Sequence, residues 1–136
     1  MKFQLHYFLA TCAFVGNVMA GGCISNSPVN QAFSLADGQA LLSDFQTGNI
    51  NGFSDDFPLN ALSFETETTG SAKVTIENDF LFENTHVFFS SVASAVQQIL
   101  DQCCEGSTQD PCFGGKVTIQ GDSGLDVDVT LSDINS

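Results

Sequence analysis

The most regular pattern of hydrophobic and polar positions in the chain lies between Val87 and Cys112. Apolar residues recur there at intervals of three and four positions, at Phe88, Val92, Ala95, Val96, Ile99, Leu100 and Cys103. This spacing predicts an amphipathic helix whose apolar face packs on the core. The adjacent cysteines Cys103 and Cys104 mark its end, and the polar run 105–111 predicts an exposed loop that leads to Cys112.

A shorter helix is predicted between Ser34 and Gly48. Ser34 is a typical N-cap residue with the acidic Asp37 three positions later, and Gly48 is typical of the residue that follows a helix. The apolar positions that share one face are Leu35, Leu41, Leu42 and Phe45. Gly38 lies inside this segment and lowers its helix propensity by about 1 kcal/mol relative to alanine.

A first β-hairpin is predicted from Leu62, where the period changes to two. One side of the strand carries Leu62, Phe64 and Thr66, and the other carries Ser63, Glu65 and Glu67. We expect both glutamates to point outward. A turn over 69–71 leads to a return strand over 72–77.

A second hairpin pairs Lys116–Gln120 with Leu125–Leu131 around the turn 121–124, and its alternation is the clearest in the chain. The order of elements is therefore helix, hairpin, helix, hairpin. This order predicts an α+β fold, a small disulfide-stapled sandwich with one antiparallel sheet of two hairpins and two helices packed on one face.

Two connecting segments lack a regular period. Asn49–Asn60 is rich in Asn, Gly and Asp, and we expect a loop whose phenylalanines fold back onto the core. In the second segment, the apolar run Phe80–Phe82 is compatible with a strand or a loop. The long helix then begins either at Thr85 or at Ser90.

The first 20 residues have the features of a secretory signal peptide. Lys2 precedes an apolar run from Tyr7 to Val15, and Val18–Ala20 has the small residues typical of a cleavage site. The apolar run is shorter than the roughly 18 residues that a membrane-spanning helix needs. We expect a signal peptide over 1–20 and a single secreted domain over 21–136.

Removal of the signal peptide leaves four cysteines, which are Cys23, Cys103, Cys104 and Cys112. An even number in a short secreted chain predicts two disulfides. A bridge between the adjacent Cys103 and Cys104 would be strained, so two pairings remain. Both tie Cys23 to the end of the long helix, through Cys103 or Cys104, and both close a short loop to Cys112.

The predicted secreted part is strongly acidic. Two lysines stand against 16 acidic residues, with no arginine, which gives a formal charge of −14. Proteins bind nucleic acid and anionic lipid through lysine and arginine. We therefore exclude both as primary partners, and we expect no membrane insertion.

His86 is the only histidine of the predicted secreted part, so any histidine-based catalytic or metal site has to use it. The cysteines are assigned to disulfides, and no nucleophile-elbow pattern surrounds a serine. A ribonuclease would also need a cation to stabilise phosphate charge, and the chain has no arginine. We therefore expect a protein that is not an enzyme.

Two sets of acidic residues are weaker candidates for chemistry. Oxygen ligands for calcium could come from Asp122, Asp126, Asp128 and Asp133, but their spacing does not match an EF-hand loop, and a solvated strand face explains them better. Carboxylates for glycoside hydrolysis could come from the strand positions Glu65, Glu67, Glu77 and Asp128. A sugar subsite usually has a stacking Trp or Tyr, which the secreted part lacks. We expect no metal and no cofactor.

Several segments resemble the virus-encoded killer toxins of the corn smut fungus and their relatives in fungal genomes. They are Gly21–Ser25, the helix from Ser34, the strand pair after Leu62, and Ile99–Ser107 leading to Gly115–Ile119. The resemblance implies an α/β sandwich with the N-terminal cysteine tied to the helix end. This chain differs from the toxin in having fewer cysteines, an adjacent cysteine pair, and an acidic charge where the toxin is basic. The resemblance therefore implies the fold of the toxin but not its channel-blocking activity. A mushroom glycan-binding domain is a second resemblance.

These features predict a secreted, non-enzymatic fungal effector or toxin-like protein that contributes to virulence by binding a host or competitor target during colonisation. We expect the exposed sheet face or the loop Asn49–Asn60 to make the contact. The alternative is a glycan-binding, lectin-like module of the fungal wall or extracellular space.

Overall fold

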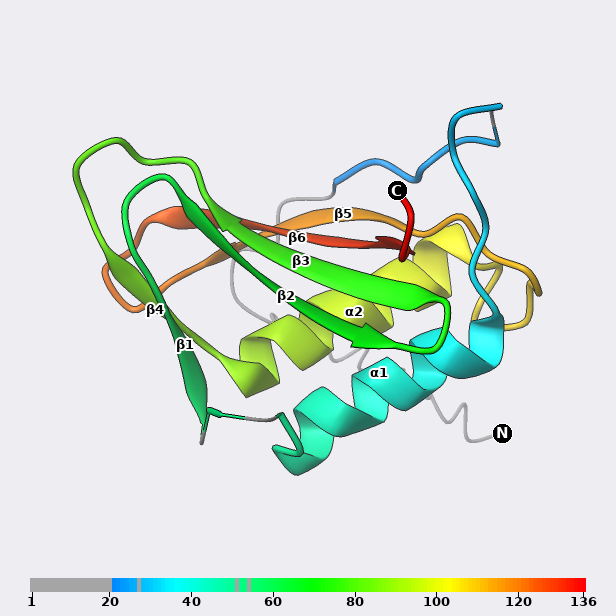
Figure 1. Ribbon diagram of the computed structural model, residues 1–136, viewed down its shortest axis with the longest axis horizontal. Coiled ribbons are helices and arrows are strands. Elements are labelled where there is room, and N and C mark those ends of the chain that lie inside the picture. The colour runs from blue at the N-terminus through cyan, green and yellow to red at the C-terminus, as the bar shows by residue number, and fades with distance from the viewer. Residues whose placement is uncertain (1–20, 27, 51, 54) are drawn as a thin grey trace, which may run out of the picture.

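Four strands form the main sheet, and two helices cover one of its faces in the computed structural model (Figure 1). The structure describes residues 21–26, 28–50, 52, 53 and 55–136, so the predicted signal peptide lies outside the described residues. The helices are α1 (Leu35–Thr47) and α2 (Phe89–Cys103). The strands of the main sheet are β2 (Ser63–Thr69), β3 (Ala72–Asn78), β5 (Gly115–Gln120) and β6 (Asp126–Asp133).

The strand order β2-β3-β6-β5 confirms the predicted sheet of two antiparallel hairpins. The hairpins join where β3 pairs with β6 in antiparallel register, with Val74 opposite Leu131 and Ile76 opposite Val129. Residues directly opposite each other point to the same face. These four residues are therefore buried together under the helices.

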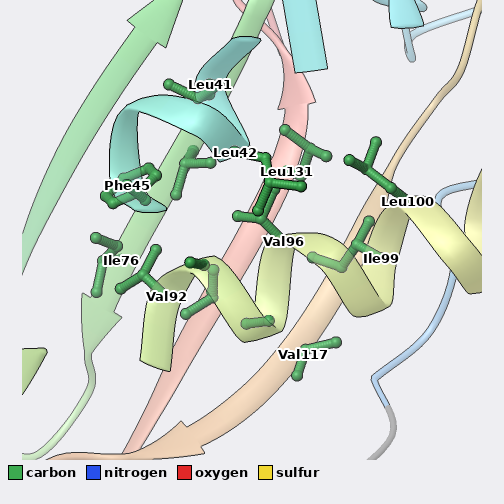
Figure 2. Packing of buried hydrophobic residues seen from close by; sticks show 14 of the residues in the cluster. Leu41, Leu42, Phe45, Ile76, Val92, Val96, Ile99, Leu100, Val117 and Leu131 are labelled. Atoms are coloured by element: carbon green, nitrogen blue, oxygen red, sulfur yellow. The ribbon is translucent and has the colours of Figure 1, made fainter. Parts of the chain in front are cut away.

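The core lies between the helices and this face of the sheet. Figure 2 shows Leu42 and Phe45 of α1 meeting Val92 and Val96 of α2 above the sheet residue Leu131. Each fully buried side chain of this size stabilises the fold by roughly 1.5–3 kcal/mol. The predicted apolar faces of both helices are confirmed at these positions.

Helix α2 begins close to one of its two predicted starts and not at the other. Of the two predicted starts, Ser90 is close to the observed first residue, Phe89, and Thr85 is wrong because it opens strand β4 (Thr85–Phe88). Phe88 was predicted on the buried face but is exposed, and Phe89 is buried in its place. The helical period does not extend to Phe88 because this residue still has extended backbone angles.

A second, two-stranded sheet was not predicted. Strand β1 (Asp56–Leu59) pairs with β4 in antiparallel register, and it lies within the segment that was expected to be a loop. The expectation that its phenylalanines fold back is confirmed. Phe57 is completely buried, and Phe53 packs on it with ring centroids 4.7 Å apart.

The predicted outward orientation of Glu65 and Glu67 is wrong. They stand opposite Ile76 and Val74 of β3, so both glutamates are on the helix-covered face and are half-buried. Burial, followed by the charges of Glu65 and Asp44, raises the pKa of Glu67 above its ordinary value. This position is possible because β2 is an edge strand, where an inward charge also discourages pairing with other chains.

The N-terminus of α1 is capped differently from the prediction. Ser34 occupies the N-cap position, but its hydroxyl makes no capping hydrogen bond. The backbone N–H of Leu35 instead donates to the carboxylate of Asp110 at 3.0 Å. Asp37 accepts hydrogen bonds from the N–H and the hydroxyl of Ser71, at 2.7 and 2.6 Å, and so ties α1 to the β2–β3 turn.

The two predicted disulfides are present, and the structure resolves the open pairing. Cys23 pairs with Cys103, and Cys104 pairs with Cys112. The first bridge holds the N-terminal segment against the edge of β5, where Ile24 N–H donates to the carbonyl of Gly114 at 2.9 Å. None of the helices in the described ranges is both long enough and apolar enough to cross a bilayer.

Candidate functional site

Exposed apolar side chains gather where β3 leaves the sheet toward β4. Phe82 is 91% exposed and Leu81 is 62% exposed at the end of this loop. The neighbouring turn between β1 and β2 adds apolar surface, and in Figure 1 the two connections lie side by side at the upper left. We call this surface the apolar tip, and define it as Leu62, Phe64, Phe80, Leu81 and Phe82.

The loop that carries the apolar tip is anchored by the buried side chain of Asn78. Its amide nitrogen donates to the carbonyl oxygens of Asn60, at 3.1 Å, and Glu83, at 2.9 Å. Its amide oxygen accepts from the N–H of Phe80 at 3.1 Å. One buried amide therefore closes the base of the loop and ties it to the chain before β2.

Two further hydrogen bonds fix the β1–β2 turn beside the loop. The side-chain oxygen of Asn84 accepts from Ala61 N–H at 2.9 Å, and Leu62 N–H donates to the carbonyl of Phe80 at 3.0 Å. A surface that is already ordered loses less conformational entropy when it binds. The apolar tip is thus presented on a fixed backbone, although its side chains are exposed.

Acidic residues surround the apolar tip. Asp79 and Glu83 bracket the apolar tripeptide in the chain, and Glu77 stands directly opposite Phe64 on the open face of the sheet. We call these three residues the acidic rim, and all of them are exposed.

The cation nearest to the rim in the described part of the chain is already engaged. Lys116 forms an ion pair with Asp128. The hydrogen bond to Asp128 raises the pKa of Lys116 above its usual value, and the charges of Asp79 and Glu77 act in the same direction.

A groove runs between the C-terminal part of α1 and the outer side of α2. Its volume is about 990 Å³, and its lining combines apolar surface with polar side chains. The polar part includes the amides and carboxylates of Gln46, Gln97, Gln98, Asp101 and Gln102. Phe88, which is 51% exposed, contributes an aromatic surface at one end.

The structure brings His86 and Asp122 together. Nδ1 of His86 lies 3.4 Å from a carboxylate oxygen of Asp122, and both side chains are about half exposed. Asp122 also accepts from the His86 N–H at 2.8 Å and from the Thr85 hydroxyl at 3.2 Å. The N–H of His86 is the main group that holds the pKa of Asp122 below its usual range. The nearby Ser123 hydroxyl bonds to Thr85, so these contacts do not form a nucleophile–histidine pair.

The structure brings only some of the other acidic candidates together. Asp128 is held by Lys116 and by the Thr118 hydroxyl at 2.7 Å, whereas Asp133 is buried and accepts from Asn135 N–H at 2.8 Å. Within the described ranges, no three histidine, cysteine or carboxylate residues are grouped as metal ligands. Glu77 stands opposite Asp128 on the open sheet face, while Glu65 and Glu67 lie on the other face.

The apolar tip was not predicted as a site. The sequence predicted contact through the exposed sheet face, where Phe64 lies, or through the loop Asn49–Asn60. The phenylalanines of that loop are buried or half-buried and so offer little apolar surface. The available signal was the apolar run Phe80–Phe82 between acidic residues, in a segment without a regular period. No model of a known protein family matches the chain, and no curated protein shows significant similarity to it.

Proposed function

We propose that this protein is a secreted, non-enzymatic effector of the fungal type, which binds a protein of a host or competitor through the apolar tip. The observation that carries the proposal is Phe82, which is 91% exposed on a loop that the buried Asn78 holds in place. Contiguous exposed apolar surface on a small protein commonly marks an interaction site.

The cysteines support the proposal that the protein is secreted. Cys23–Cys103 and Cys104–Cys112 are both paired, and disulfides are typical of proteins from oxidising compartments. The pattern of the first 20 residues and the resemblance to fungal killer toxins point the same way.

The energetics favour binding as the role of the apolar tip. An exposed phenylalanine gains nothing from the core, yet burying it in a partner is worth roughly 1.5–3 kcal/mol. Aromatic anchors at the centre of an interface carry much of the binding energy. Phe80 and Phe82 are suited to this role because their backbone is fixed before binding.

The test is capture of partners from host extracellular fluid by the disulfide-intact protein. We expect the wild type to retain a specific protein and Phe82→Ser to lose it, with unchanged folding by circular dichroism. Ile134→Ser is the control, because Ile134 is an apolar residue outside the apolar tip that is 42% exposed. Equal capture by the wild type and Phe82→Ser would overturn the proposed site.

The groove between α1 and α2 favours a second candidate function, glycan binding. Planar amide and carboxylate side chains suit the paired hydroxyls of a sugar, and Phe88 offers a surface on which a sugar ring can stack. Glycan-array binding that is lost in Phe88→Ala and kept in Phe82→Ser would support this candidate. The reverse pattern, or no sugar binding, would reject it.

A further inference from the structure

The acidic rim indicates which kind of protein fits the apolar tip. We propose that the partner presents an apolar cleft bordered by lysine or arginine side chains. This inference rests on the proposed function and adds the chemistry of the partner to it.

Charged residues stand directly beside the apolar residues of the tip in the chain. Asp79 and Glu83 flank the Phe80–Phe82 tripeptide on both sides, and the backbone of Glu83 is fixed by Asn78. A partner that buries Phe82 must therefore approach both carboxylates. Complementary charge at the border of an apolar contact steers association and selects the partner.

Neither lysine in the described part of the chain forms an ion pair with a rim residue. Lys116 lies close enough to interact with the charges of Asp79 and Glu77, but its ion-pair partner is Asp128, and the Lys73 ammonium donates to the carbonyl of Ser136. With 16 acidic residues against these two lysines, the wider field of the protein has the same sign as the rim. A partner with basic side chains would supply the ion pairs that the rim lacks.

The same charges argue against other occupants. A second copy would bring a like-charged rim against the first, which is unfavourable. Insertion of the tripeptide into a bilayer would carry Asp79 and Glu83 to the lipid interface, and anionic headgroups would repel them. A basic protein surface with an apolar cleft satisfies both the apolar and the acidic groups.

The test uses a phage-displayed library of random peptides, selected on the intact, disulfide-bonded protein. We expect enriched peptides to combine Leu, Met or aromatic residues with flanking Lys or Arg. For the corresponding synthetic peptides, Phe82→Ser should weaken binding by about 30-fold, as expected for an interface anchor. The affinity should fall as salt rises, because rim charges act through screened electrostatics.

The rim is tested with the double variant Asp79→Asn/Glu83→Gln. It should weaken binding about 10-fold at low salt and reduce the dependence on salt. Its matched control is Asp55→Asn/Glu105→Gln, which removes the same charge from two exposed positions outside the rim. An equal loss in the control would show that only net charge matters and would overturn the inference.

Three other outcomes would also overturn the inference of a partner with a basic border. They are enrichment of uncharged or acidic peptides, a dimer in solution that Phe82→Ser dissociates, and Phe82-dependent binding to phosphatidylcholine vesicles. The proposed function fails separately. A host protein captured through Phe82 without salt dependence would leave the function intact and reject only the basic border, whereas capture that ignores Phe82 would reject the site itself.

Discussion

The ring of Phe33 packs so closely against Gly38 that a methyl group at residue 38 would lie 2.7 Å from ring carbon Cε2. Phe33 is completely buried, and its backbone exchanges two hydrogen bonds with Cys112. The ring therefore has little freedom to move. The glycine that weakens the helix propensity of α1 is required by the packing of the chain that enters it.

Gly38→Ala should destabilise the protein, although alanine is the better helix former. Overpacking costs about 1–3 kcal/mol and the gain in helix propensity is about 1 kcal/mol, so we expect a net loss of up to about 2 kcal/mol. Urea denaturation measures the difference. Gln39→Ala, at an exposed position in the same turn, should change stability by less than about 0.5 kcal/mol. A Gly38→Ala variant as stable as the wild type would show that Phe33 can move aside.

Asn78→Ala should loosen the loop that carries the apolar tip. The substitution removes three hydrogen bonds at a fully buried position, and we expect a loss of about 2–3 kcal/mol because carbonyl and amide groups are left without partners. Amide exchange should speed up most at Phe80. Phe82→Ser, by contrast, should leave the unfolding free energy nearly unchanged. Unaltered exchange in Asn78→Ala would mean that the amide does not anchor the loop.

The disulfide that closes the long loop between Cys23 and Cys103 should contribute strongly to stability. Cys23 and Cys103 are separated by 80 residues, so their bridge removes about 4 kcal/mol of unfolded-chain entropy in the loop-closure model. The double variant Cys23→Ala/Cys103→Ala should lose most of this amount in urea denaturation. Cys23 is exposed and contributes little packing, whereas Cys103 is partly buried against the core, so its loss adds a packing contribution. A loss below about 1 kcal/mol would contradict the loop-closure account.

Acid should weaken the tie between α1 and the β2–β3 turn. The hydroxyl and the N–H of Ser71 hold the pKa of Asp37 below its ordinary value of 3.8, so the folded state binds this proton less tightly than the unfolded state. The resulting stability is present above that ordinary value and is lost as the pH falls toward the lowered pKa. Asp37→Asn should have a lower Tm at neutral pH and a shallower decline in acid. Parallel curves for the two proteins would contradict this.

Glu67→Gln should change the stability at neutral pH in the opposite direction to Asp37→Asn. Burial and the charges of Glu65 and Asp44 raise the pKa of Glu67, so the ionised form costs stability in the folded state. The variant should be more stable at neutral pH, by less than about 1 kcal/mol because water still screens the group. The advantage should shrink as the pH falls through the raised pKa and vanish below the ordinary value of 4.5. Glu105→Gln, in an exposed loop, should show no such gain.

Much of the architecture follows from local sequence pattern. Val92, Val96 and Ile99 recur at helical spacing and are buried as predicted, and the alternation of Val127 and Val129 places β6 correctly. The even number of cysteines predicts two bridges. These features are set by periods of a few residues, which the sequence displays directly.

The missed features depend on contacts between distant segments. The alternation in β2 is real, but pairing with β3 decides that Glu65 faces the helices and Phe64 the solvent. Strand β1 has only four residues, and its partner β4 follows much later in the chain. The carboxylate of Asp110 caps a helix 75 residues away, which no local rule reveals. The apolar tip was missed for the same reason, since exposure is a property of the assembled fold.

The buried Asn78 makes the conformation of its loop independent of the side chains that the loop exposes. It closes its loop through backbone groups and makes no use of the side chains of Leu81 or Phe82. Substitutions at those two positions therefore change what the loop contacts without a cost in folding. The loop is therefore a place where other short segments can be grafted while the core stays constant.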